Sequence, residues 1–277
     1  MCFVLRFPGG KPKVFTMSYD DGTFADYRLI EIMNKNGIKG TFNINGDKIS
    51  PVDANGKTKG RLSVNQIKEL YLSNGHEIAL HTLTHPTLVD LPVERVTYEY
   101  LKDKEILEEI TGEIIRGSAY PNSAYNDKVI EALKAAGVSY ARGGDQTESF
   151  ALPKDWHKVM PTVRHRNEKL FTLGEEFLSR KHAGHHLPIM FYLMGHSYEF
   201  NLDNNWDRIE SFLEMMGGKD DIWYATNIEI YDYIEAFKRV RFNLACTFAE
   251  NPTSTDVWIS KDNGIHKLEA GKRTYID

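Results

Sequence analysis

Apolar, strand-like runs alternate with helical patterns about every 30 residues along most of this 277-residue chain. That rhythm is typical of βα units, in which parallel strands are joined by covering helices. Eight runs have the character of strands: residues 14–19, 40–44, 77–81, 114–119, 138–142, 158–163, 188–194 and 222–225. Eight such units predict an α/β fold, a distorted (β/α) barrel of seven or eight parallel strands.

Local signals mark several of the intervening helices. One segment begins with Ser63 as a potential N-cap and stops at Gly75, and a second runs from Asn126 to Gly137. The stretch at residues 204–218 follows the same logic. Beyond about residue 240, short β-rich runs are separated by Asn-Gly and Ala-Gly turns. We therefore expect a barrel over residues 1–240 and a small β-hairpin appendage packed on it over residues 241–277.

Composition excludes some classes of partner. The formal net charge is -5, and acidic and basic residues are interspersed. The sequence therefore has no basic stripe, and we do not expect it to bind nucleic acid. Cys2 and Cys246 have no CxxC spacing, which argues against a disulfide framework or a thiolate metal site. The first apolar run is too short for a signal peptide or a membrane span, which predicts a cytoplasmic protein without membrane contact. A secreted protein whose leader had been removed is the alternative, and the oligomeric state is left open.

The first strand-like run ends on two like charges, Asp20 and Asp21, followed by Gly22. Asp-Gly is a common turn, which is the simplest explanation. However, adjacent carboxylates at the end of a buried strand repel each other and need a compensating partner. A cation held by one carboxylate would provide that partner and leave the other for chemistry. The position fits, because functional groups of barrels collect at the carboxyl ends of the strands.

The run at residues 77–81 ends in "HTLTHP", which places His81 and His85 at the same end of the barrel. Pro86 disfavours helical geometry at His85, so we expect the pair on a tight loop. Taken alone, this spacing is weak evidence for a site and fits a structural or solvated pair better. Together with the carboxylates, two imidazoles form a three-ligand set suited to zinc or a similar divalent metal, with one open position. The second carboxylate could then act as a base.

The run at residues 188–194 is continuously apolar, as a strand buried on both faces should be, and it ends at His196. A histidine there can protonate a leaving amine or alcohol near neutral pH, a structural histidine being the alternative. His165 and Arg166 follow another strand at the same end and could contact substrate. The stretch "KHAGHH" at residues 181–186 lies at the other end, and we expect it to be a solvated loop.

Three stretches, "MSYDDG", "HTLTH" and "LMGHS", resemble the first, second and fifth motifs of the polysaccharide deacetylases of carbohydrate esterase family 4. Those proteins are metal-dependent hydrolases on a distorted (β/α) barrel, and the resemblance covers residues 14 to about 235. It implies a divalent ion, zinc first, with cobalt, nickel or manganese as alternatives. The implied roles are Asp20 as catalytic base, Asp21, His81 and His85 as metal ligands, and His196 as catalytic acid.

The third motif departs from the family pattern. The stretch "GSAYPNSAYN" has Ala119 where the family has an arginine, and it keeps only Pro121 of two prolines. It resembles a divergent branch with a Phe-Ala-Tyr-Pro motif. The resemblance implies the backbone N–H of Asn122 as an oxyanion donor, with Tyr120 in the same loop contacting substrate.

The missing arginine orients the base in the family, and we expect Arg142 to replace it, a surface arginine being the alternative. The fourth motif is hard to locate. We expect Trp156 to line the acetyl pocket, a core tryptophan being equally consistent with the sequence. Met194 stands two residues before His196, where the family has leucine.

These residues predict a metal-dependent hydrolase that removes acetyl groups from an N-acetylated, or O-acetylated, sugar within an oligo- or polysaccharide. Two alternatives remain open. The same side chains would hydrolyse another small amide, such as a ureide or a cyclic imide. A barrel that binds glycan without turning it over is the second alternative, although such a protein need not retain these ionisable residues.

Overall fold

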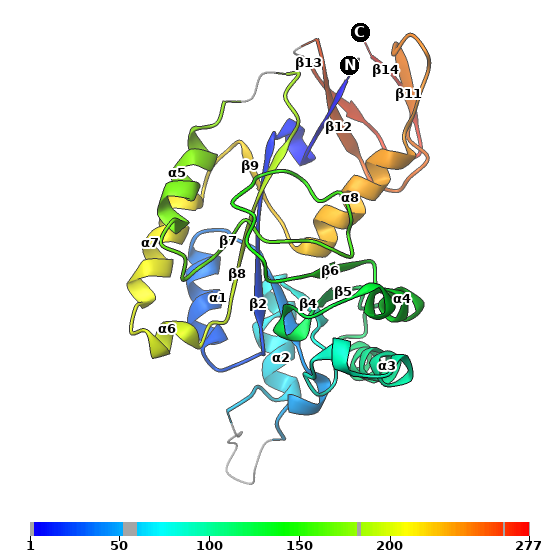
Figure 1. Cartoon of the computed structure of the whole chain (residues 1–277). Helices are drawn as coiled ribbons and strands as arrows, with labels where there is room; N and C mark the ends of the chain where they lie inside the picture. Colours follow the sequence, from blue (N-terminus) through cyan, green and yellow to red (C-terminus); the bar gives the residue numbers. More distant parts are fainter. Residues whose placement is uncertain (1–2, 52–59, 182–183, 263, 277) are drawn as a thin grey trace.

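A parallel sheet curled into a distorted (β/α) barrel forms the centre of the computed structural model, which describes residues 3–51, 60–181, 184–262 and 264–276 (Figure 1). The strand order is β6-β5-β4-β3-β2-β8-β7, and β9 pairs with β2. These are the eight predicted strands, so the predicted fold is confirmed. Their bounds are β2 (Lys13–Asp20), β3 (Thr41–Ile44), β4 (Glu77–Leu80), β5 (Gly117–Ala119), β6 (Tyr140–Arg142), β7 (Val163–Arg164), β8 (Ile189–Gly195) and β9 (Ile222–Tyr224).

Strand β2 is the central strand of this sheet, and every one of its residues is buried. It pairs in parallel with β3, β8 and β9. At its start the buried Lys13 forms an ion pair with Asp221 (Nζ to Oδ2, 2.9 Å). At its other end Asp20 is in register with Asn43 of β3, so the carboxyl ends of neighbouring strands meet there.

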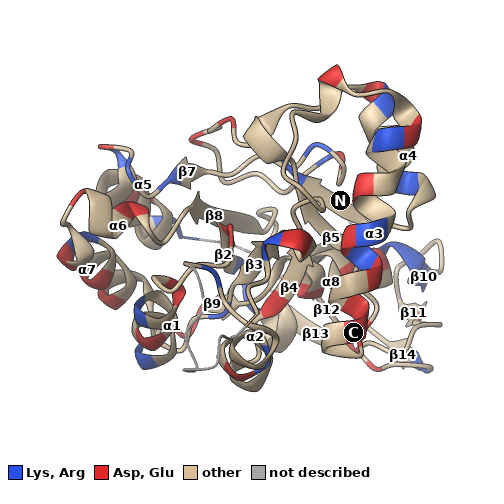
Figure 2. Cartoon of the chain, turned by 90° about the horizontal axis from the view of Figure 1, so that it is seen from below, with Lys and Arg blue, Asp and Glu red and all other residues tan. Residues whose placement is uncertain are grey.

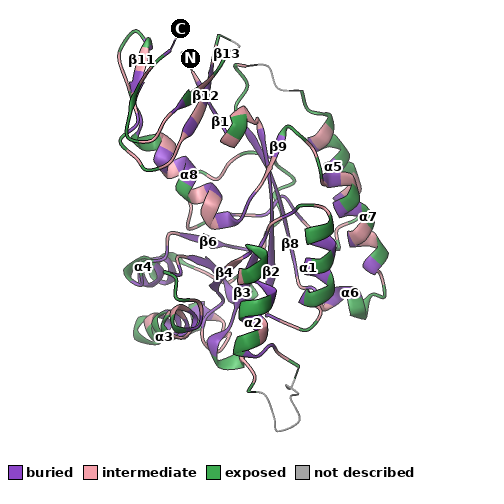
Figure 3. Ribbon diagram, turned by 180° about the vertical axis from the view of Figure 1, so that it is seen from behind, coloured by how far each residue is buried: buried purple, intermediate pink, exposed green. Residues whose placement is uncertain are grey.

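Helices cover the outside of the barrel, with exposed outer faces around the buried strands (Figure 3). The predicted N-cap is confirmed: the Ser63 side chain accepts from Gln66 N in a capping box. The segment predicted to begin at Asn126 is also a helix, and the Asn126 side chain caps it by accepting from Val129 N. No helix in the described part of the chain is both long and apolar enough to cross a membrane. The helices are α1 (Asp26–Lys35), α2 (Val64–Leu70), α3 (Val93–Thr111), α4 (Asp127–Ala135), α5 (Leu170–Ser179), α6 (Glu199–Leu202), α7 (Trp206–Met216) and α8 (Asn227–Arg239).

The barrel closes through a segment that is only partly a strand. Of the run predicted at residues 158–163, only Val163 lies in β7, while Val159 forms one isolated bridge with Arg142 of β6. Pro161 stands between them and has no N–H to donate, which explains why the ladder is interrupted. The segment nevertheless connects β6 to β8 and so encloses the barrel.

The appendage contains more than the predicted hairpin. The hairpin is β12 (Val257–Lys261) and β13 (Gly264–Leu268), and β1 (Val4–Arg6) adds a third antiparallel strand. A second small sheet consists of β10 (Arg241–Phe242), β11 (Phe248–Glu250) and β14 (Arg273–Tyr275). Both ends of the chain lie beside these sheets, away from the carboxyl end of β2 (Figure 1). Cys2 and His182, which entered the sequence predictions, lie outside the described residues.

Candidate metal centre and active site

A cavity of about 380 Å³ opens at the carboxyl ends of the barrel strands. Of the residues that the sequence analysis offered for the site, all but Trp156, His165 and Arg166 line it, although they come from five separate strand ends and loops. Arg164 and Tyr198 also line it, and the sequence analysis did not identify either. Acidic and basic residues are interspersed over this end of the molecule, with no single-sign face (Figure 2).

Three side chains form a group that could hold a metal ion. One ligand atom each from Asp21, His81 and His85 lies within 4.8 Å of the others. Ligand atoms at about 2.0–2.2 Å from a tetrahedral zinc ion lie roughly 3.3–3.6 Å from one another, so movements on the order of 1 Å would bring the three atoms into range. His81 Nδ1 donates to the carbonyl oxygen of Ala119 at 2.9 Å, which leaves Nε2 free to bind a metal. The residues therefore fit a divalent transition metal.

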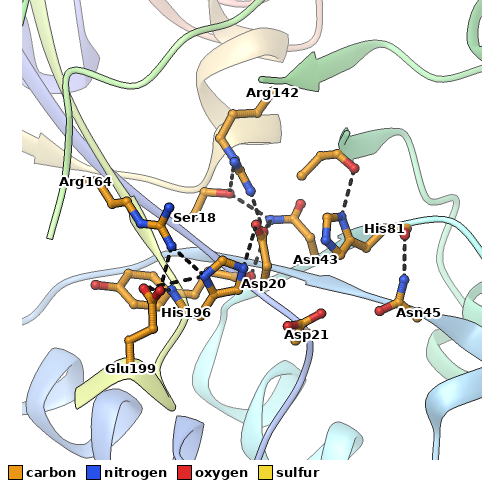
Figure 4. Close-up of polar contacts among 12 residues, drawn as sticks. Ser18, Asp20, Asp21, Asn43, Asn45, His81, Arg142, Arg164, His196 and Glu199 are labelled. Atoms are coloured by element: carbon orange, nitrogen blue, oxygen red, sulfur yellow. Dashed lines mark hydrogen bonds and ion pairs between the residues drawn. The ribbon is translucent and has the colours of Figure 1, made fainter. Parts of the chain in front are cut away.

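Asp20 lies beside this group, and one of its two carboxylate oxygens is held by neighbouring side chains. Its Oδ1 accepts from Asn43 Nδ2 at 2.8 Å and forms an ion pair with Arg142 (Figure 4). Ser18 supports the same arrangement, because its Oγ accepts from Arg142 Nε at 3.1 Å. Arg142 is buried, so the surface-arginine alternative is wrong. Oδ2 of Asp20 carries no comparable tether and faces His196.

The charge state of Asp20 follows from these neighbours. Burial alone would raise its pKa, but the positive charge of Arg142, helped by His81 and His196, holds the pKa of Asp20 well below its usual range. Asp20 is therefore ionised throughout the neutral range. An ionised carboxylate beside a possible metal site is what a general base requires.

His196 stands between two carboxylates. Its Nε2 lies 3.8 Å from Asp20 Oδ2, and its Nδ1 lies 3.5 Å from Glu199 Oε2. Burial opposes the charged form, but the hydrogen bond to Glu199 and the negative charges of Asp20 and Glu199 raise the pKa of His196 above its ordinary value. The imidazole can therefore be protonated near neutral pH, as a general acid must be.

Glu199 is the functional residue that sequence reasoning missed. It accepts from Arg164 Nη2 at 2.6 Å and Arg166 Nη1 at 2.8 Å, and it lies 3.2 Å from His165 Nε2. Burial alone would raise the pKa of Glu199, but its histidine and arginine partners outweigh that effect and hold the pKa well below its usual range. Its spacing of three residues after His196, at the start of α6, is the signal that could have indicated it.

His165 and Arg166 support this cluster and are not among the residues that line the cavity. His165 is buried, and its ring stacks on Tyr19 and lies against Phe200. Arg166 pairs with Asp203 as well as with Glu199. Both residues therefore contact the cluster around Glu199, and their contact with substrate stays a prediction.

The loop after β5 brings two predicted substrate contacts to the cavity. Tyr120 stacks on Tyr125 with ring centroids 4.6 Å apart, and its hydroxyl donates to the carbonyl oxygen of His157. Asn122 has a positive φ of 55°, and its side chain donates to Thr87 Oγ1 at 3.1 Å. These contacts fix the loop beside the metal-ligand group.

Trp156 lies elsewhere. Its carbonyl oxygen accepts from Ala141 N in the middle of β6. Its ring packs edge-on against Tyr231 of α8, next to the smaller hydrophobic core. The core-tryptophan alternative thus describes its environment, and the prediction that Trp156 lines the site is wrong, because it is not among the residues that line the cavity. Of the "KHAGHH" stretch, the Gly184 and His186 carbonyls accept hydrogen bonds from Arg6, at the appendage end of the molecule.

Comparisons with known proteins show what this chain resembles in sequence and in fold. Residues 8–141 match the family model described as polysaccharide deacetylase, and the match includes the three proposed metal ligands and Asp20. A chitin deacetylase from Pestalotiopsis sp. is 25% identical over 145 residues, which are 52% of this chain and 46% of that protein. A chitooligosaccharide deacetylase from Rhizobium leguminosarum bv. phaseoli is 25% identical over 150 residues, 53% of this chain and 58% of that protein. The chain thus spans about half the length of these curated relatives.

The fold extends beyond the matched segment. A solved structure of a candidate polysaccharide deacetylase from Mycobacterium smegmatis superposes with a TM-score of 0.59 at 17% identity. The superposition covers 85% of this chain and 94% of the other. At 17% identity, the similarity to this solved structure shows a shared fold only. The family match over residues 8–141 is the comparison that includes the motifs. Residues 8–141 of this chain therefore match the polysaccharide deacetylase family in sequence, and the chain resembles a candidate member of that family in fold.

Proposed function

We propose that this protein is a metal-dependent hydrolase that removes acetyl groups from an N-acetylated sugar within an oligo- or polysaccharide, with O-acetylated sugars as a less favoured substrate. The observation that carries the proposal is the convergence of an ionised carboxylate, a histidine of raised pKa and a three-ligand set in one cavity. The names of the chitin and chitooligosaccharide deacetylases among its relatives support the substrate class.

The proposed roles follow from the geometry. Asp21, His81 and His85 would hold one divalent ion, zinc first, with cobalt, nickel or manganese as alternatives. When bound, the ion supplies Lewis acidity, which polarises the acyl carbonyl and makes water more acidic. Asp20 accepts the proton of the attacking water through Oδ2, since Oδ1 is occupied by Asn43 and Arg142.

His196 supplies the second proton transfer. As the C–N bond breaks, its imidazolium donates a proton to the leaving amine, and acetate carries the oxygen that came from water. The backbone N–H of Asn122 is the proposed donor to the oxyanion. Tyr120 and Met194 line the cavity and are the proposed contacts of the acetyl group, while Arg142 acts through Asp20.

Acetate release tests this proposal. The protein, stripped of metal and then supplied with zinc, cobalt, nickel or manganese, is incubated with N-acetylglucosamine oligomers, acetylated xylan, cyclic imides and ureides. We expect metal-dependent acetate release from the acetylated sugars and none from Asp20→Asn. Turnover confined to the cyclic amides would favour the amidohydrolase alternative. Glycan binding without any turnover would favour the non-catalytic alternative.

A further inference from the structure

The loop that carries His81 and His85 is held in an unfavourable backbone conformation. Thr82 has a φ of 63° and His85 a φ of 62°, both in the left-handed region. This region is sterically unfavourable for residues other than glycine, and most of all for a β-branched residue such as threonine. Such conformations persist only where surrounding contacts hold them. The position of the two imidazoles therefore depends on whatever fixes this loop.

Helix α3 fixes the middle of the loop through Glu99. This side chain is fully buried, and its Oε2 accepts from Thr84 N at 2.8 Å while its Oε1 accepts from Thr84 Oγ1 at 3.0 Å. The backbone carbonyl of Glu99 also accepts from Leu83 N at 3.2 Å. One residue of the helix thus binds two consecutive residues between the proposed ligands.

Asp103, one helical turn further along α3, fixes the beginning of the loop. It is also fully buried, and its Oδ2 accepts from the backbone N of His81 itself at 3.1 Å. Its Oδ1 accepts from Gly46 N at 2.7 Å, which ties the loop after β3 to the same carboxylate. A Cβ on Gly46 would lie 3.0 Å from that oxygen, so glycine permits the close approach. Glu99 and Asp103 are spaced i, i+4 and lie on one face of the helix.

We propose that Glu99 and Asp103 are positioning residues that preorganise the ligand loop, so that α3 sets the metal affinity of the site. The inference rests on the metal site of the proposed function. Neither side chain is among the described residues that line the cavity, so both act through the loop and not on metal or substrate. Without them the loop keeps only its other contacts, such as the hydrogen bond from Asn45 Nδ2 to the carbonyl oxygen of Thr82 at 2.8 Å. It can then relax more readily towards an unstrained backbone, and metal binding must restore the ligating conformation.

Metal affinity measured by competition with a chromophoric chelator tests this role. Asp103→Asn has one acceptor oxygen for two backbone N–H groups, and Glu99→Ala has none for Thr84. We expect zinc to bind about 10–100-fold more weakly to each, the range typical for lost supporting contacts of metal ligands. Glu99→Gln should retain most of the affinity, because its amide can still accept from Thr84 N and donate to Thr84 Oγ1.

Glu77→Gln is the matched control. Glu77 is a largely buried carboxylate at the opposite end of β4, and it accepts from Thr41 Oγ1 at 2.8 Å, Tyr140 OH at 2.7 Å and Ile228 N at 2.9 Å. A purely structural carboxylate affects only the melting temperature. We therefore expect Glu77→Gln to leave the zinc affinity unchanged.

Three results would contradict the inference. Unchanged zinc affinity in folded Glu99→Ala and Asp103→Asn, as judged by circular dichroism, would overturn it while leaving the deacetylase proposal intact. A wild-type protein that binds no metal would overturn both. Should Glu99→Ala fail to fold, Thr84→Val removes the hydroxyl donor alone, and it should weaken zinc binding several-fold; wild-type affinity there would contradict the inference.

Discussion

Arg142 of β6 forms an ion pair with Asp20 of β2. Three strands lie between β6 and β2 in the sheet. Both side chains are buried, and Ser18 and Asn43 complete the hydrogen bonds around them. The arginine that orients the proposed base thus comes from a part of the chain 122 residues away in sequence. A buried pair of this kind contributes little when intact, but removing one partner leaves an uncompensated charge.

Two substitutions of Asp20 should have the same effect on acetate release but different effects on the free energy of unfolding. We expect Asp20→Ala to lower the free energy of unfolding by about 3–5 kcal/mol, because Arg142 is left buried and unpaired. Asp20→Asn keeps an acceptor for Arg142 and should lose less. Both should release no acetate and still bind metal. Urea denaturation and elemental analysis measure the two effects, and loss of metal from Asp20→Asn would mean that Asp20 is a ligand.

Removal of Arg142 should change the acid limb of the pH profile. In the wild type the pKa of Asp20 lies below its usual value of about 3.9, so lowering the pH stops the reaction only below that range. Arg142→Met removes the main charge that lowers this pKa, so the acid limb of kcat/KM should move to higher pH. An acid limb at the wild-type position would show that Arg142 does not control Asp20.

Glu199→Gln should move the alkaline limb of the kcat/KM profile to lower pH. Glu199 helps to raise the pKa of His196, and the reaction requires protonated His196, so activity is lost as the pH rises through that pKa. Without the carboxylate the pKa falls, and the alkaline limb should move to lower pH. NMR titration of His196 measures the same shift directly.

Asp203→Asn is the control for Glu199, because it removes the other carboxylate partner of Arg166 without touching His196. It should leave the titration of His196 close to that of the wild type. Equal shifts in both variants would indicate a general charge effect and would contradict the specific role of Glu199.

The metal ligands should be separable from the other histidines. Two remaining ligands rarely hold zinc, so His81→Ala, His85→Ala and Asp21→Asn should each lose most of the bound metal. His157, whose ring contacts the carbonyl of Val138 away from the cavity, provides a control substitution that should retain it. Elemental analysis after gel filtration gives the metal content. Full metal occupancy in the first three variants would place the ion elsewhere.

His196→Ala should reveal the general acid through its dependence on the leaving group. Amide substrates should lose about 10²–10⁴-fold in rate, because an amine departs poorly without a proton. An aryl acetate, whose leaving group departs unaided, should be affected much less. Equal losses on both substrates, or loss of metal, would assign His196 a structural or ligating role.

The strand ends that carry Asp20, His81 and His196 could be predicted because they depend on local pattern and on one topological rule. A parallel barrel brings the carboxyl ends of its strands together, so residues found at those ends in the sequence meet in space. The burial of Arg142 was also predictable in outline, because the third motif lacks its arginine and the isolated carboxylate needed a partner.

Other features depend on contacts that sequence pattern does not contain. The role of Glu199 follows from the direction of its side chain at the start of α6, where a glutamate is ordinarily exposed. Trp156 was misplaced because the segment that closes the barrel pairs with β6 irregularly around Pro161, so its position along that strand could not be counted from the sequence. The left-handed backbone at Thr82 is equally invisible, since threonine gives no signal for it.

The pairing of β1 with β12 joins Val4 to Ser260. At the usual synthesis rates of about 5–20 residues per second, β1 is made roughly 13–50 s before its partner exists. Throughout that interval the strand has exposed edges, while all eight barrel strands and their helices are made before β12. Pairing of β1 with β12 must therefore come late in folding, after the barrel strands have been made, although β1 precedes all of them in the sequence.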